Sequence, residues 1–302
     1  MTLSRARMGV LVPAWAVLLS VSLLPVVIAQ EVLHLTITAD ERALGSIVVI
    51  AAAALLTLAW APWRALRPFL AVLFTLVAAQ WVVYTQLDRL PVFADRLANP
   101  AFGVYMPAEQ VLNLIVTGAM VAVLFLLTRD RRAFYLAKGD MAAPAAPISW
   151  MRVRSGDRWS ELGRNLSVFI TLGTLAFLVL SGRPTVDLVV RVLPMIPVIL
   201  LCAALNAFNE EVTYKASLLS ALIGPLGSRQ ALRMVAAYFG IAHFYGVPYG
   251  IVGVALAWFL GWILARSMLE TRGLGWAWFI HFVQDVAIFS FMALGEITPG
   301  GG

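Results

Sequence analysis

The stretch Asn206-Ala-Phe-Asn-Glu-Glu-Val-Thr-Tyr-Lys215 places two adjacent carboxylates, Glu210 and Glu211, inside otherwise apolar sequence. The largely apolar runs 198–205 and 216–223 flank it on either side. At the centre of a bilayer helix each ionised group costs about 2.5 to 3.5 kcal/mol. Acids in such a position are functional-site candidates by default, so we ask which other residues could be their partners.

The composition is that of an integral membrane protein. Hydrophobic residues make up 61% of the 302 residues and charged residues 13%, whereas an average soluble domain has about 45–50% apolar residues. The alternation of a β-barrel is absent, and we predict an all-α transmembrane bundle of about eight or nine spans. The Lys and Arg residues lie in loops between apolar runs. The net charge of +6 therefore carries topology information, and we expect no nucleic-acid partner.

The apolar runs divide the chain into three regions. Residues 1–128 form an N-terminal membrane region of four helices, residues 129–164 form a basic loop, and residues 165–302 form the catalytic membrane region. The middle of the loop, Met141 to Pro147, is typical of a flexible linker. The expected spans lie near residues 9–29, 44–62, 68–86, 110–128, 165–181, 187–207, 229–246, 249–268 and 275–294.

The distribution of basic residues predicts the orientation. Loop 129–164 is rich in Arg, whereas the loops on the opposite side carry few basic residues. The positive-inside rule then places this loop and the N-terminus in the cytoplasm. We expect a multi-pass protein of the plasma or inner membrane of a prokaryotic cell.

The segment around the two acids is predicted to be irregular. Residues 187–224 are too many for one straight bilayer helix, and residues 211–224 are too few to cross alone. We therefore expect a kinked or broken helix near Asn206 to Glu211. Asn206 and Asn209 flank the acids, where we expect them to satisfy backbone groups that the break frees.

Three pairs at spacing i, i+4 put possible partners on one face of three different helices. Glu before Lys is the favourable order for a helical ion pair, which lessens the cost of one buried carboxylate. An acid four residues after a histidine could accept the ring N–H and fix its tautomer. The pairs are Glu211 with Lys215, Phe239 with His243, and His281 with Asp285.

In this order the motifs resemble those of the CPBP family of intramembrane proteases, the CAAX proteases and bacteriocin-processing enzymes that include type II CAAX prenyl endopeptidases. The family pattern is Glu-Glu-x-x-x-Arg, Phe-x-x-x-His and His-x-x-x-Asn or Asp, and it covers roughly residues 190–295 of this chain. Lys215 stands where the family has Arg, which keeps the charge and loses the bidentate fork. The resemblance implies catalytic roles for Glu210, Glu211, His243, His281 and Asp285, and supporting roles for Lys215 and Phe239.

The resemblance also implies a reaction, the hydrolysis of a peptide bond within the membrane. One glutamate would activate water, His243 would share that water or polarise the scissile carbonyl, and His281 with Asp285 would stabilise the oxyanion. Zinc is the competing candidate cofactor, with Glu211, His243 and His281 as ligands. The chain has no His-Glu-x-x-His, and we favour metal-free hydrolysis. The expected partner is a peptide or lipidated protein substrate in the lipid bilayer.

Two other functions fit the sequence. A proton-coupled transporter could relay protons through the same acids, although the first four spans show no matching set of charges. A non-proteolytic scaffold or immunity protein on the same fold would explain Lys215. Upright helices would place His243 near the end of its span and His281 near the start of a parallel one. Tilt or shifted helix boundaries must therefore bring the two rings together.

Overall fold

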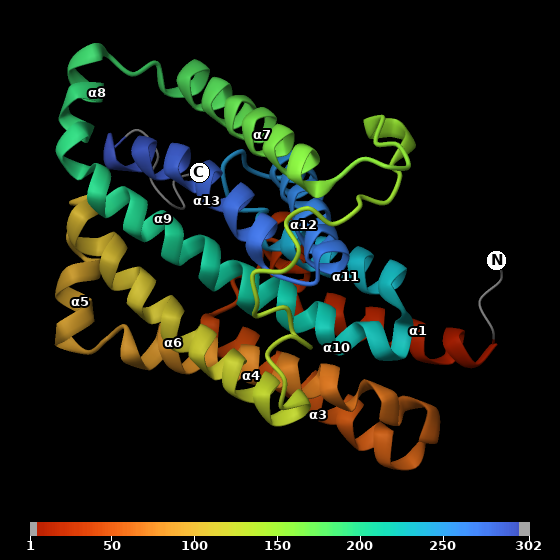
Figure 1. Ribbon diagram of the computed structural model, residues 1–302. Helices are drawn as coiled ribbons and strands as arrows, with labels where there is room; N and C mark the ends of the chain where they lie inside the picture. The colour runs from red at the N-terminus through yellow and green to blue at the C-terminus, as the bar shows by residue number, and fades with distance from the viewer. Residues whose placement is uncertain (1–4, 296–302) are drawn as a thin grey trace.

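The chain folds as an all-α bundle in the computed structural model, which describes residues 5–295 (Figure 1). Within these residues seven helices are long and apolar enough to cross a membrane. A pair bent by 57°, Gly9–Val21 with Leu24–Val32, raises the number to eight. The predicted all-α transmembrane architecture is confirmed. The sides of the membrane and the division into regions at residues 128 and 164 stay predictions.

The first half contributes helices that lie side by side along one flank of the bundle, red to yellow in Figure 1. They are α1 (Arg5–Val21), α2 (Leu24–Val27), η1 (Ile28–Val32), α3 (Ala39–Ala59), η2 (Ala61–Leu66), α4 (Arg67–Val82), η3 (Val83–Leu87), α5 (Pro91–Leu97) and α6 (Phe102–Thr128).

The second half begins after the basic loop, in which η4 (Ser149–Met151) is a single 3₁₀ turn, and supplies the helices that carry the three motifs. They are α7 (Trp159–Gly182), α8 (Val186–Val192), η5 (Leu193–Met195), α9 (Ile196–Glu210), η6 (Glu211–Ala216), α10 (Ser217–Leu226), α11 (Ser228–Ala242), α12 (Ile251–Thr271) and α13 (Gly275–Ala293).

Helix α6 begins eight residues before the expected boundary at residue 110. The sequence places prolines at 91, 100 and 107, which predicts a loop up to residue 109 with a short interfacial helix. The short helix exists as α5, but Pro107 lies inside α6. A proline this close to a helix start leaves only one carbonyl without its intrahelical partner. The longer α6 brings Glu109 and Gln110 into the bundle.

Helix α11 is shorter than the span expected at 229–246. It has 15 residues, ends at Ala242 and is not among the helices long enough to cross a membrane. Gly246 and Pro248 follow in a turn where the backbone N–H of Gly250 donates to the carbonyl of Phe244. The chain therefore turns back within the bundle, and His243 lies at the turn.

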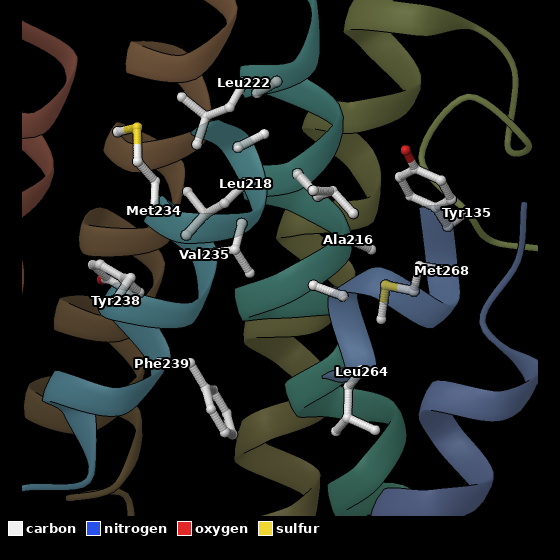
Figure 2. Packing of buried hydrophobic residues seen from close by; sticks show 14 of the residues in the cluster. Tyr135, Ala216, Leu218, Leu222, Met234, Val235, Tyr238, Phe239, Leu264 and Met268 are labelled. Atoms are coloured by element: carbon white, nitrogen blue, oxygen red, sulfur yellow. The ribbon is translucent and has the colours of Figure 1, made fainter. Parts of the chain in front are cut away.

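The interface of α10, α11 and α12 is the centre of the apolar core (Figure 2). Leu218 and Leu222 of α10 point toward Met234 and Val235 of α11, and all four residues are fully buried. This packing fixes α11 against the helix that carries the glutamates.

The segment 141–147 is not the flexible linker that its composition predicts. The indole of Trp159 is fully buried and donates to Glu270 Oε2 at 2.8 Å, and the same oxygen accepts the backbone N–H of Ala146 at 3.0 Å. Arg266 contacts the other oxygen of Glu270 at 2.8 Å and donates to the Ala146 carbonyl at 2.8 Å. Since Glu270 and Arg266 belong to α12, the loop is fastened to the bundle by long-range contacts that no local pattern reveals.

We predict that Glu270→Ala releases this loop. Hydrogen bonds to charged groups contribute about 1.5–3 kcal/mol, and the substitution removes two together with an ion pair. Trypsin should then cleave after Arg152, Arg154 or Arg158 faster in the variant than in the wild type. Glu161→Ala, at an exposed acid nearby, should leave the cleavage rate unchanged. Equal rates for Glu270→Ala and the wild type would contradict the fastening role of Glu270.

Candidate active site

The two glutamates lie where the helix changes type. Helix α9 ends at Glu210 and η6 is a π-helical turn, in which the backbone N–H of Ser217 bonds to the carbonyl of Val212. The helix expected to be kinked or broken near Asn206 to Glu211 is not broken, because the irregularity there is the π-turn of η6, which begins at Glu211, and residues 186–226 form one helical stretch. Its change of direction lies earlier, between α8 and α9, where Figure 1 shows a sharp turn. Single π-turns inside α-helices are frequent at functional sites.

Glu211 binds two partners through one carboxylate oxygen. Its Oε1 lies 2.7 Å from Nζ of Lys215 and 2.7 Å from Nδ1 of His281, so the predicted Glu–Lys pair is present. Both Glu211 and Lys215 are 0% exposed. The Nζ atom also lies 3.3 Å from the ring centroid of Phe239. A carboxylate on one side and an aromatic face on the other compensate for the desolvation of this cation.

His281 faces acids on both edges of its ring. With Nδ1 on Glu211, its Nε2 lies 3.6 Å from Oε2 of Glu210 and 3.5 Å from Oδ1 of Asp285. We expected Asp285 to accept the ring N–H, but 3.5 Å exceeds an ordinary hydrogen bond. Glu211 makes that hydrogen bond instead, and so it determines how the ring is oriented.

Asn206 joins the two helices on which Glu210 and Asp285 lie. Its Nδ2 donates to Oδ2 of Asp285 at 3.0 Å and to Oε1 of Glu210 at 3.3 Å. This amide orients two carboxylates that face the same imidazole nitrogen. Our expectation that Asn206 and Asn209 serve the backbone of a broken helix is wrong, because both amides bond to groups of neighbouring helices.

Phe239 and His243 approach the site from the end of α11. Nδ1 of His243 lies 2.7 Å from the carbonyl oxygen of Phe239, and the two rings are 4.4 Å apart between centroids. The Phe239 ring is also 6.3 Å from the ring of His281. Phe239 therefore lies beside both histidine rings, but among residues 5–295 no carboxylate is within ion-pair distance of His243.

A close approach of α11 and α12 positions these two side chains. A Cβ added at Gly240 would lie 2.8 Å from the backbone oxygen of Val254, and one at Gly261 would lie 2.9 Å from the Phe239 ring. Any larger residue at either position would push α11 away from α12. Both glycines are needed for this contact, a role the sequence does not reveal.

Helix α6 contributes a row of polar side chains that sequence reasoning missed. Asn209 donates to Oε1 of Gln110 at 3.3 Å and accepts from Thr117 at 3.1 Å. Thr117 also contacts the hydroxyl of Thr213 at 3.0 Å. Gln110 and Thr117 are seven residues apart, a spacing that puts them on one face of an apolar helix. This spacing is the feature of the sequence from which the row could have been predicted. The contacts of the row link α6 to the helix that carries the glutamates.

The zinc ligand set does not fit this arrangement. Oε1 of Glu211 is bonded to Lys215 and to Nδ1 of His281, so Glu211 and the other ring nitrogen of His281, Nε2, lie on different edges of the imidazole and do not face a common point. Across residues 5–295, no group of three His, Cys, Asp or Glu side chains is arranged to bind a metal ion. We therefore derive no step through zinc.

We predict that Lys215 and Glu211 are coupled in stability. Removing one partner of a buried pair leaves an uncompensated charge and costs about 3–5 kcal/mol. Lys215→Met should therefore lower the melting temperature of the purified protein strongly. The double variant Glu211→Gln/Lys215→Met should lose less than the sum of the two single variants.

The matched control for this cycle is Lys138→Met, which removes an exposed lysine of the basic loop and should leave the melting temperature unchanged. If Lys215→Met melted at the temperature of the wild type, the buried pair would have no such role.

One comparison with known proteins covers the segment that contains these residues. No curated protein and no solved structure matches the chain. Residues 192–287, which contain both glutamates and both histidines of the site, match one family model, described as "Type II CAAX prenyl endopeptidase Rce1-like". The resemblance drawn from the three motifs is thereby confirmed: over residues 192–287 the chain matches the Rce1-like family of type II CAAX prenyl endopeptidases.

Proposed function

We propose that this protein is an intramembrane endopeptidase that hydrolyses peptide bonds of membrane-embedded or lipidated substrates with a water activated by Glu210. One observation carries the proposal. Glu210 and Glu211 each have one oxygen, Oε2, without a hydrogen-bond partner among residues 5–295, but only Oε2 of Glu210 lies near Nε2 of His281, at 3.6 Å. The side chain of Glu210 is 24% exposed, whereas Glu211 is fully buried. The accessible glutamate suits chemistry and the buried one suits support.

The contacts of Glu211 favour a role as a positioning residue. Its Oε1 bonds to Lys215 and His281, so a proton taken up by Glu211 would weaken both contacts. Glu210 has no lysine partner, and Asn206 bonds only to its other oxygen, Oε1. Oε2 is therefore available to accept a proton from water.

The histidines divide the remaining roles. A carbonyl oxygen can only accept, so Nδ1 of His243 carries the proton in its contact with Phe239, and the neutral ring keeps an acceptor at Nε2. This nitrogen suits a second hydrogen bond from the attacking water. Nε2 of His281 faces two carboxylates, which favours a proton there, and a protonated Nε2 can donate to an oxyanion.

Glu210 and His281 can carry out all the proton transfers and hydrogen bonding that the hydrolysis requires. Glu210 takes one proton from water while the oxygen attacks the scissile carbonyl carbon, and His281 donates to the oxygen that becomes negative. On collapse the carbon–nitrogen bond breaks, and Glu210 returns the proton to the leaving nitrogen. Asp285, aligned by Asn206, stabilises the charge of His281 throughout.

Lys215 is compatible with this mechanism. In the site it acts as a buried counter-charge to a single oxygen of Glu211, a contact that a point charge can make. The loss of the arginine fork therefore removes no contact that the proposed chemistry uses.

We predict that Glu210→Gln abolishes cleavage and leaves the fold intact. Loss of a general base costs about 100- to 10,000-fold in turnover. The assay uses the purified protein in nanodiscs with two fluorogenic probes, a farnesylated peptide and an unmodified transmembrane peptide. The control is Asp187→Asn, at an exposed acid of α8, which should cleave like the wild type.

Two outcomes would overturn the proposal. Undiminished cleavage in Glu210→Gln would exclude Glu210 as the base. Proton flux through the wild type in proteoliposomes, lost in Glu210→Gln and without cleavage of either probe, would favour a transporter instead.

A further inference from the structure

A polar cavity of about 280 Å³ lies between the N-terminal helices and α11. Its lining comes from α1, α3, α4 and η3, and only Tyr238 belongs to the segment that matches the family model. Although 61% of the residues of the chain are hydrophobic, most of the side chains that line this cavity can form hydrogen bonds. The polar side chains that line it include Arg42, Ser46, Gln80, Trp81, Tyr84 and Tyr238.

Arg42 is the one charged residue of the lining. Among residues 5–295 no carboxylate lies within ion-pair distance of its guanidinium. The neighbouring acid, Asp40, accepts a hydrogen bond from the indole of Trp81 at 2.7 Å. A guanidinium without a carboxylate partner, surrounded by neutral donors, is suited to bind an anion from outside the chain.

The cavity adjoins Glu210 through a tyrosine. Gln80, in the lining, donates to the hydroxyl of Tyr214 at 2.7 Å. Tyr214 follows Glu210 by four residues, which puts both on one side of the helix. Tyr84, also in the lining, bonds to Asn113 of α6.

We propose that this Arg42 cavity binds the C-terminal carboxylate of the peptide substrate while the scissile bond lies at Glu210. The inference rests on the proposed peptidase function and adds a specificity determinant that the N-terminal helices supply. Arg42 is exposed and the side chain of Glu210 is 24% exposed, so neither residue is closed off from a substrate.

A peptide carboxylate fits the lining better than a lipid phosphate does. The cavity offers one cation and several neutral hydroxyl and amide groups, which suits a single negative charge. Sites for anionic lipid headgroups typically gather several Lys and Arg residues. The proximity of Glu210 also favours an anion that belongs to the molecule being cleaved.

The test compares one peptide with a free C-terminal carboxylate and the same peptide as a C-terminal amide. The wild type in phosphatidylcholine nanodiscs should cleave the acid with a kcat/KM about 10- to 100-fold above that of the amide, because a charge-assisted contact is lost. Arg42→Gln should remove this preference by slowing cleavage of the acid alone. Arg42→Lys should keep part of it, and Arg89→Gln, at an exposed arginine outside the cavity, should keep all of it.

Equal cleavage of acid and amide by the wild type would overturn the carboxylate subsite while leaving the peptidase function standing. An acid preference that persists in Arg42→Gln would do the same. If added phosphatidylglycerol changed cleavage of both peptides alike, and only when Arg42 is present, the cavity would be a lipid-phosphate site and the inference would be wrong. Absence of any cleavage by the wild type would instead contradict the proposed function itself.

Discussion

The contact of Glu211 with both Lys215 and His281 is the interaction on which the site depends. A carboxylate that is 0% exposed cannot remain charged in an apolar bundle without a counter-charge, and Lys215 supplies one at 2.7 Å. The same oxygen orients His281 at 2.7 Å. Three elements, η6, α11 and α13, are joined there, because Phe239 of α11 covers the lysine.

These contacts suit the two adjacent glutamates to different roles. Oε1 of Glu211 is bonded to Lys215 and His281 and its side chain is 0% exposed, whereas Glu210 is 24% exposed and faces Nε2 of His281. Two adjacent residues point into different surroundings because a helix turns by roughly 100° per residue. A pair of acids that looks redundant in the sequence becomes one support and one reactive group.

The approximate positions of most helices and the i, i+4 contacts of the site were predictable from local sequence patterns. Apolar runs identify helices because the bilayer core requires about 20 apolar residues per span. The spacing i, i+4 correctly brought Glu211 to Lys215 and placed His281 and Asp285 on one face. These contacts lie within one helix, so sequence separation determines them.

The remaining features depend on contacts between distant segments. Asn206 was expected to serve its own backbone, yet its partner Asp285 is on another helix. The loop around Ala146 has the composition of a linker, and Glu270 of α12 fixes it in place. Pro107 lies within α6, and only the packing of that helix shows that the residues after it reach the site. A single sequence does not specify which helix faces which.

The N-terminal helices take part in the site although no motif marks them. Gln110 and Thr117 of α6 bond to the glutamate helix through Asn209, and Gln80 of α4 bonds to Tyr214. Buried polar networks of this kind are stabilising only when their members are satisfied by neighbours. The position of the glutamate helix is therefore determined by both halves of the chain.

The most direct test of this account is the melting temperature of Glu210→Gln beside that of Glu211→Gln, measured on purified protein without substrate. Removing the carboxylate of Glu210 relieves repulsion between acids around His281, so this variant should melt at or above the temperature of the wild type. Glu211→Gln leaves Lys215 buried without a counter-charge and should melt well below it. Loss of stability in Glu210→Gln, with none in Glu211→Gln, would contradict the assignment of support to one glutamate and chemistry to the other.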